Sequence, residues 1–134
     1  MFIDTSAFVA VFCGEPEGAA FAQAIAAAKV RFTSPVVRLE TCMVLSSRLD
    51  RRPTEVETDF DAFLAEAQIG VRGIDDGVGG LAVKAFETYG KGRGVGAKLN
   101  LADCLSYACA KAHHAPILFK GRDFAQTDLE VAPF

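Results

Sequence analysis

Short apolar stretches alternate with segments of helical periodicity along this chain of 134 residues. The apolar stretches have the length and the bounding turn residues of strands, and they lie at 1–4, 31–33, 69–74, 116–119 and 129–132. Apolar spacing and capping residues predict helices over 5–13, 15–29, 35–49, from 53 onward, 75–89 and 101–114. Strands separated by helices usually pair in parallel. The pattern therefore predicts an α/β sandwich with a mostly parallel central sheet flanked by helices.

We expect a single domain over residues 1–134, because this length buries a sizeable core but is short for two domains. Hydrophobic residues make up 51% and charged residues 23% of the chain, a balance that excludes a disordered protein. Charged residues interrupt every apolar run before the roughly 18 residues that a membrane span needs. The first apolar stretch has no basic leader and meets Asp4 at once, so we expect a cytoplasmic location.

The net charge and the cysteines narrow the class of protein further. A net charge of −3 argues against a protein that coats nucleic acid by bulk charge, but it leaves room for a local basic surface. None of the four cysteines, Cys13, Cys42, Cys104 and Cys109, forms a CxxC pair. Free thiols in a reducing compartment are therefore expected instead of disulfides or a zinc site.

Asp4 stands where the first expected strand ends and the first helix begins. Aspartate caps helices well, because its side-chain oxygen accepts a hydrogen bond from an unpaired amide of the first turn. The same position also suits a metal ligand, because ligands of open α/β sheets gather beyond the carboxyl ends of the strands. Asp123 follows the expected strand at 116–119 by about one turn and could reach the same edge.

Two further acids lie on expected helices. Asp103 is in the first turn of the helix announced by Asn100, where either a simple dipole partner or a site acid would be placed. Glu40 lies beside apolar positions of its helix, and a carboxylate turned inward usually titrates or finds a cation. A cluster of such oxygen ligands suits Mg²⁺ or Mn²⁺ best.

The glycine-rich segment GKGRGVGAK at 90–98 invites a phosphate-loop or dinucleotide interpretation. It follows a helical segment and lacks the Gly-Lys-Ser/Thr ending, so both interpretations fail on context. The opening Asp-Thr-Ser also lacks the second acid that an aspartyl-phosphate phosphatase or a receiver domain would need.

Four segments together resemble a known family. The opening FIDTSAFVAVFCGEPE, the helix RLETCMVL, the segment LNLADCLSYACAK and the ending ILFKGRDFAQTDLE are similar to the four acidic blocks of the PIN-domain family. They resemble most closely its VapC-type toxins, the ribonuclease halves of bacterial type II toxin–antitoxin pairs. The blocks occur in order along nearly the whole chain. The resemblance implies a PIN-like three-layer sandwich.

The resemblance also implies Mg²⁺-dependent cleavage of RNA, with Mn²⁺ as an alternative metal. Asp4 and Asp103 would be the principal metal ligands, and Glu40 would complete or orient that set. Asp123 would be the fourth catalytic acid, although Arg122 stands where the family often has a further acidic or amide residue. The departure at Arg122 leaves open whether Asp123 binds the metal directly, acts through water or only closes a turn.

Substrate contacts are expected from hydroxyls and basic residues. Thr5 and Ser6 match family hydroxyls beside the site, and they serve equally well as helix caps. Arg93, Lys120 and Arg122 are expected to hold the RNA strand through its phosphates, among the candidates Arg38, Lys91, Arg93, Lys98, Lys120 and Arg122. The resemblance further implies a cognate antitoxin and a homodimer, with tRNA or another structured RNA as substrate. An inactive PIN-like binding module is the alternative function.

Overall fold

The computed structural model describes residues 1–93 and 96–134, and its strands form one sheet in the order β3-β2-β1-β4. All neighbouring strands are parallel, and the strands are β1 (Phe2–Ile3), β2 (Phe32–Thr33), β3 (Gly70–Val71) and β4 (Ile117–Leu118). Phe2 is in register with both Phe32 and Ile117, so β1 lies inside the sheet. The predicted parallel central sheet is confirmed, although each strand is shorter than the apolar stretch that predicted it.

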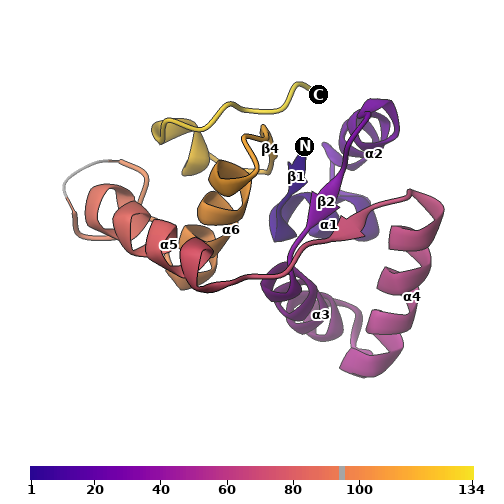
Figure 1. The fold of residues 1–134 in the computed structure, drawn as a ribbon. Coiled ribbons are helices and arrows are strands. Elements are labelled where there is room, and N and C mark those ends of the chain that lie inside the picture. The colour runs from indigo at the N-terminus through magenta and orange to yellow at the C-terminus, as the bar shows by residue number, and fades with distance from the viewer. Residues whose placement is uncertain (94–95) are drawn as a thin grey trace.

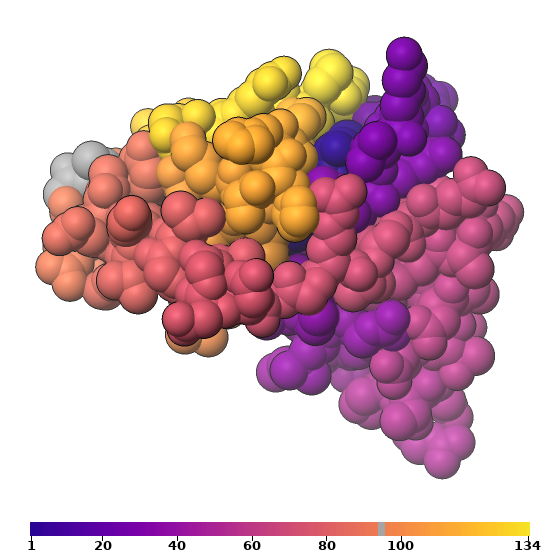
Figure 2. Space-filling model, viewed as in Figure 1, coloured from indigo at the N-terminus to yellow at the C-terminus, as the bar shows by residue number. Residues whose placement is uncertain are grey.

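Helices lie on both sides of this sheet, as an α/β sandwich requires (Figure 1). They are α1 (Thr5–Phe12), α2 (Gly18–Ala27), α3 (Pro35–Leu49), α4 (Pro53–Glu66), α5 (Asp76–Tyr89) and α6 (Leu101–Ala112). Figure 1 shows α5 and α6 on one side of the strands and α2 and α4 on the other, and α3 packs against α1, α4 and α6. Little of the indigo N-terminus is visible in Figure 2, because the surrounding segments cover β1 from this side.

Side-chain caps fix where several helices begin. Asp4, Ser34, Asp75 and Asn100 each accept a hydrogen bond from an amide N–H of the first turn of the following helix. Asp4 and Ser34 come directly after β1 and β2, so each cap marks the point where a strand turns into a helix. These helix starts therefore gather polar side chains at the carboxyl ends of the strands.

Phenylalanine rings make up much of the core. The ring of Phe8 on α1 meets the rings of Phe60 and Phe63 on α4 edge to face, at centroid distances of 4.9 and 6.1 Å. This contact ties α4 to the helix that carries the first acidic block. The phenylalanines buried to 2% exposure or less are Phe2, Phe8, Phe21, Phe32 and Phe60.

Three predicted elements differ from the observed ones. The last expected strand, 129–132, is reduced to an isolated bridge between Val131 and Ile117. The helix expected over 15–29 starts at Gly18, after a turn that contains Pro16. The turn expected at 121–124 leads into a short 3-10 helix, Phe124–Gln126. The glycine-rich segment at 90–98 includes residues 94–95, which lie outside the described residues.

All four cysteine thiols are free in the structure. Three of them, Cys42, Cys104 and Cys109, are buried. Within residues 1–93 and 96–134, none of the helices combines the length and the apolar character needed to span a membrane.

Helices α1 and α2 approach closely at Gly18. A Cβ atom built on Gly18 would lie 2.5 Å from the carbonyl oxygen of Ala10 and 3.1 Å from its carbonyl carbon. Both atoms belong to the backbone of α1, so they cannot swing aside as a flexible side chain would. The first residue of α2 therefore has to lack a side chain.

We expect Gly18→Ala to destabilise the fold by about 1–3 kcal/mol, the usual range for overpacking a tight contact. Gly80→Ala is the matched control, because Gly80 lies in α5 and a Cβ there meets nothing within 4 Å. Removing a helical glycine at that exposed site should stabilise the protein by roughly 0.5–1 kcal/mol. Urea unfolding of both variants measures the difference, and equal effects would contradict the close contact.

Candidate active site

A cavity of about 470 Å³ opens at the carboxyl edge of the sheet. Its lining brings together three acids from distant parts of the chain: Asp4 after β1, Glu40 on α3 and Asp103 on α6. The hydroxyl residues Thr5 and Ser6 line the same cavity. So does Lys120, which follows β4, and six of the residues that the sequence predicts for the site therefore share one cavity.

Asp4 is both a helix cap and a member of this cavity. One carboxylate oxygen, Oδ2, accepts hydrogen bonds from the backbone N–H of Ser6 at 3.0 Å and from its hydroxyl at 2.7 Å. The other oxygen, Oδ1, accepts from the hydroxyl of Ser106 on α6 at 2.9 Å. Asp4 is only 5% exposed, so these three donors replace the water that it loses. Both interpretations of Asp4 from the sequence are compatible with this geometry.

Asp103 belongs to the capping box that starts α6. Its Oδ2 accepts from the backbone N–H of Asn100 at 3.0 Å, and its own N–H donates to Oδ1 of Asn100 at 2.9 Å. The pKa of Asp103 rises from 3.8 to about 6, chiefly because burial removes water from the carboxyl group. The N–H of Asn100 opposes this rise. The negative charges of Asp4, Glu40 and Asp123 add to it, so each of these three acids lies close enough to Asp103 to repel its charge.

The donor set of this cavity fits a divalent cation. Carboxylates that repel one another gain from a positive charge placed between them, and oxygen ligands suit Mg²⁺ and Mn²⁺. The hydroxyl oxygen of Thr5 is buried without a hydrogen-bond partner in the structure, so a polar atom beside Asp4 is also left to be satisfied. In the part of the chain that the structure describes, no three His, Cys, Asp or Glu side chains already stand as a metal-holding group. The acids therefore repel one another across the cavity without forming a closed ligand set.

The remaining predicted site residues lie outside the cavity lining. Asp123 is exposed at the start of the 3-10 helix, and its negative charge adds to the rise in the pKa of Asp103. Arg93 is exposed, and its guanidinium lies over the ring of Phe86, 4.6 Å from the centroid. Arg122 is exposed next to Asp123. Their roles stay predictions.

Among the other basic candidates, Arg38 is engaged with α4. Its Nη1 pairs with Oε1 of Glu57 at 3.2 Å and with a carboxylate oxygen of Asp61, so the guanidinium bridges α3 and α4. Lys91 and Lys98 are exposed on either side of residues 94–95.

Sequence reasoning missed three residues of the site. Ser106 lies three residues after Asp103 on α6, a spacing that puts both on one helix face, and a buried hydroxyl in an apolar helix is a signal that could have found it. Glu15 and Arg48 also line the cavity and form an ion pair there. Their pairing depends on how α3 packs beside the turn after α1, which no local pattern reveals.

Residues 1–130 match the PIN domain family. The chain belongs to this family. The resemblance inferred from the four acidic blocks is thereby confirmed, and the three acids from the first three blocks are those that meet in the cavity.

Its relatives in sequence carry ribonuclease names. Ribonuclease VapC28 of Mycobacterium tuberculosis is 38% identical over 132 residues, which cover 98% of this chain and 97% of the relative. Ribonuclease VapC of Mycolicibacterium smegmatis is 39% identical over 129 residues, which cover 96% of this chain and 97% of the relative.

Two solved structures share the fold of this PIN-domain chain. Mycobacterium tuberculosis VapC20, described as a Sarcin-Ricin loop cleaving toxin, superposes with a TM-score of 0.75 at 20% identity and covers 98% of each chain. A toxin–antitoxin complex from Klebsiella pneumoniae gives 0.70 at 19% identity, covering 99% of this chain and 97% of that one. The three-layer α/β fold predicted from the sequence is therefore shared with known toxins.

The raised pKa of Asp103 predicts a pH dependence of stability. The folded pKa of about 6 exceeds the ordinary 3.8, so the native state binds the extra proton and loses stability as pH rises between these values. Asp103→Asn keeps an oxygen for the Asn100 N–H but cannot ionise. In chelator, its unfolding temperature relative to wild type should therefore increase as the pH goes from about 5 to about 7.5.

Asp76→Asn is the control for this prediction, since it removes a first-turn carboxylate from α5 outside the cavity. Thermal unfolding across the same pH range should give no comparable increase. If the unfolding temperatures of Asp103→Asn and wild type differed by the same amount at all pH values, the raised pKa would be contradicted.

Proposed function

We propose that this chain is a Mg²⁺-dependent endoribonuclease that acts as the toxin of a toxin–antitoxin pair. The convergence of Asp4, Glu40 and Asp103 on one cavity carries the proposal. Support comes from the relatives that cover almost the whole chain and are named VapC ribonucleases. The reaction is the hydrolysis of an RNA phosphodiester bond.

Asp4, Glu40 and Asp103 are the residues that would hold the metal, with Asp123 as a fourth acid that acts from outside the cavity lining. When bound, Mg²⁺ would neutralise charge on the scissile phosphate and lower the pKa of an attacking water. Mn²⁺ has the same preference for oxygen ligands and is the second candidate.

The chain's own residues prepare this site in three ways. Ser6 and Ser106 fix both oxygens of the Asp4 carboxylate, so its position is set before any ligand arrives. The capping box holds Asp103 at the start of α6. Because the pKa of Asp103 is raised to about 6, its carboxyl group can release a proton close to neutral pH. A bound cation or a higher pH would favour the charged form.

The proposed partners follow from the same assignment. RNA is the substrate, and a structured RNA such as tRNA is the candidate, bound through its phosphates by Lys120, Arg93 and Arg122. A cognate antitoxin neutralises the toxin, a role supported by the toxin–antitoxin complex that shares this fold.

We further propose a single domain that works as a homodimer in the cytoplasm. Four free thiols fit that reducing compartment.

Cleavage of purified cellular RNA, including tRNA, tests the activity. Wild-type protein free of antitoxin should cut RNA with Mg²⁺ or Mn²⁺ and should stop when chelator is added. Asp103→Asn should reduce the rate on the order of 10²-fold or more, the scale for losing a group that stabilises charge in the transition state. Asp76→Asn, with the same change of charge outside the cavity, should cut like wild type.

Binding of the metal is measured separately by thermal unfolding. Mg²⁺ should raise the unfolding temperature of wild type by mass action and should stabilise Asp103→Asn less. If folded wild-type protein binds Mg²⁺ but cuts no RNA with either metal, the alternative of an inactive binding module replaces the proposal.

A further inference from the structure

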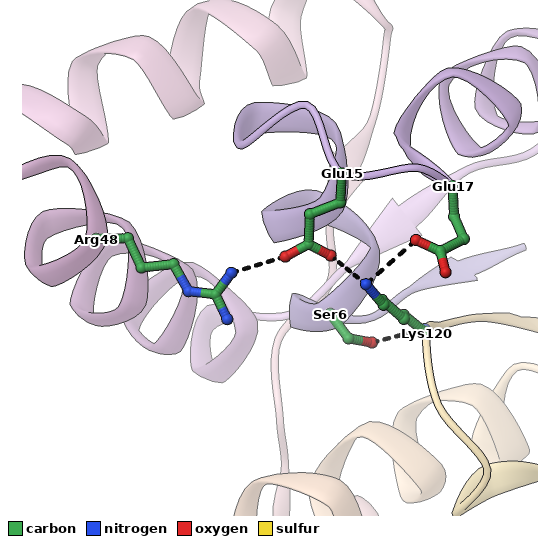
Figure 3. Close-up of polar contacts among 5 residues, drawn as sticks. All are labelled: Ser6, Glu15, Glu17, Arg48 and Lys120. Atoms are coloured by element: carbon green, nitrogen blue, oxygen red, sulfur yellow. Dashed lines mark hydrogen bonds and ion pairs between the residues drawn. The ribbon is translucent and has the colours of Figure 1, made fainter.

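An ionic network lies on the rim of the cavity, outside the acids assigned to the metal. The carboxylate of Glu15 is held between two cations from distant segments, as Figure 3 shows. Its Oε1 accepts from Nη1 of Arg48 at 2.7 Å, and its Oε2 accepts from Nζ of Lys120 at 2.6 Å. Lys120 also contacts Oε2 of Glu17 at 3.2 Å. Glu15, Arg48 and Lys120 all line the cavity that contains Asp4 and Asp103.

The two cations are arranged as an anion site. Each oxygen of the Glu15 carboxylate has its own cation, and the side chain of Glu15 is only 18% exposed. A phosphodiester group also presents two charged oxygens, and arginine and lysine are the side chains that most often contact them. The pKa of Glu15 is lowered by its hydrogen bonds to Lys120 and Arg48, so Glu15 is a permanent anion at neutral pH.

Both cations are connected to the acids of the cavity, Lys120 through Ser6 and Arg48 through α3. The backbone N–H of Lys120 donates to the hydroxyl of Ser6 at 2.9 Å, and that hydroxyl donates to Asp4. Arg48 lies on α3 eight residues after Glu40, a spacing that keeps them on neighbouring parts of one helix face. Removing Glu15 from between the cations would therefore leave both of them at the cavity.

We propose that Arg48 and Lys120 form a binding subsite for a backbone phosphate of RNA, and that Glu15 occupies this subsite until the phosphate displaces it. The inference rests on the proposed function, because it names a contact between the same cavity and its RNA. Glu15 acts as an internal competitor: RNA has to break both ion pairs of Glu15 before it gains the two cations, while Lys120 keeps its contact with Glu17. RNA therefore binds more weakly than it would if Glu15 did not pair with Arg48 and Lys120.

RNA binding by variants that cannot cleave tests this competition. In an Asp103→Asn background with Mg²⁺, a labelled single-stranded RNA of mixed sequence should bind Glu15→Gln about threefold to tenfold more tightly, the size of one or two exposed ion pairs. Glutamine keeps the size of the side chain but removes the negative charge. Replacing both Arg48 and Lys120 by alanine in the Glu15→Gln protein should abolish the gain.

Asp59→Asn is the matched control, because Asp59 lies on α4 outside the cavity and forms an ion pair with Arg51. It changes the net charge equally and should leave RNA affinity nearly unaltered. The proposal is overturned if Glu15→Gln binds RNA no more tightly than its parent, or if Asp59→Asn gives the same gain. Should Glu15→Gln fail to fold, Arg48→Ala alone must still weaken binding, and unchanged affinity would overturn the proposal.

The cleavage assay separates this inference from the proposed function. If Glu15→Gln binds RNA more tightly than its parent but wild-type protein cuts no RNA, the phosphate subsite is supported and the proposed nuclease activity is overturned. Metal-dependent cleavage together with an unaltered Glu15→Gln affinity overturns the subsite alone.

Discussion

Repulsion of the Asp103 carboxylate by those of Asp4 and Glu40 is the constraint that the structure around the cavity has to satisfy. Hydrogen-bond donors next to Asp4 and Asp103 offset this repulsion. Asp4 takes its donors from Ser6 and Ser106, and Asp103 takes one from the backbone of Asn100. Asp4 and Asp103 also take part in the starts of α1 and α6. The geometry of the site and the starts of these helices therefore cannot vary independently.

Charge is separated within the cavity even though the whole chain is mildly acidic. Asp4 lies where β1 turns into α1, Glu40 lies on α3 and Asp103 in the first turn of α6, whereas Arg48 and Lys120 are paired with Glu15 and Glu17. A chain with a net charge of −3 repels a polyanion at long range. Attraction of such a ligand then depends on a few cations placed next to the site, and on what those cations are bound to beforehand.

The fold was largely predictable because its signals are local. The alternation of apolar and helical segments, together with caps such as Ser34 and Asp75, determines most elements to within a few residues. The last strand was overestimated because LEVA has an apolar pattern but lies at the edge of the sheet, where only Val131 pairs. Asp4, Glu40 and Asp103 could be predicted as a group from the family blocks. Glu15 and Arg48 could not, since their pairing arises only when segments more than 30 positions apart are packed together. Ser106 had a local signal, its hydroxyl in an apolar helix, but its partner Asp4 lies 102 positions away.

The hydroxyl of Ser6 has a direction that limits what it can bind. It has one proton, which goes to Asp4, and one of its lone pairs receives the backbone N–H of Lys120. Only a lone pair remains for any further contact. Ser6 can therefore accept a hydrogen bond from a water or a ribose 2′-hydroxyl, or touch a cation, but it has nothing to donate to a phosphate oxygen. At this part of the cavity, Ser6 therefore serves only as a hydrogen-bond acceptor or as a ligand of a cation.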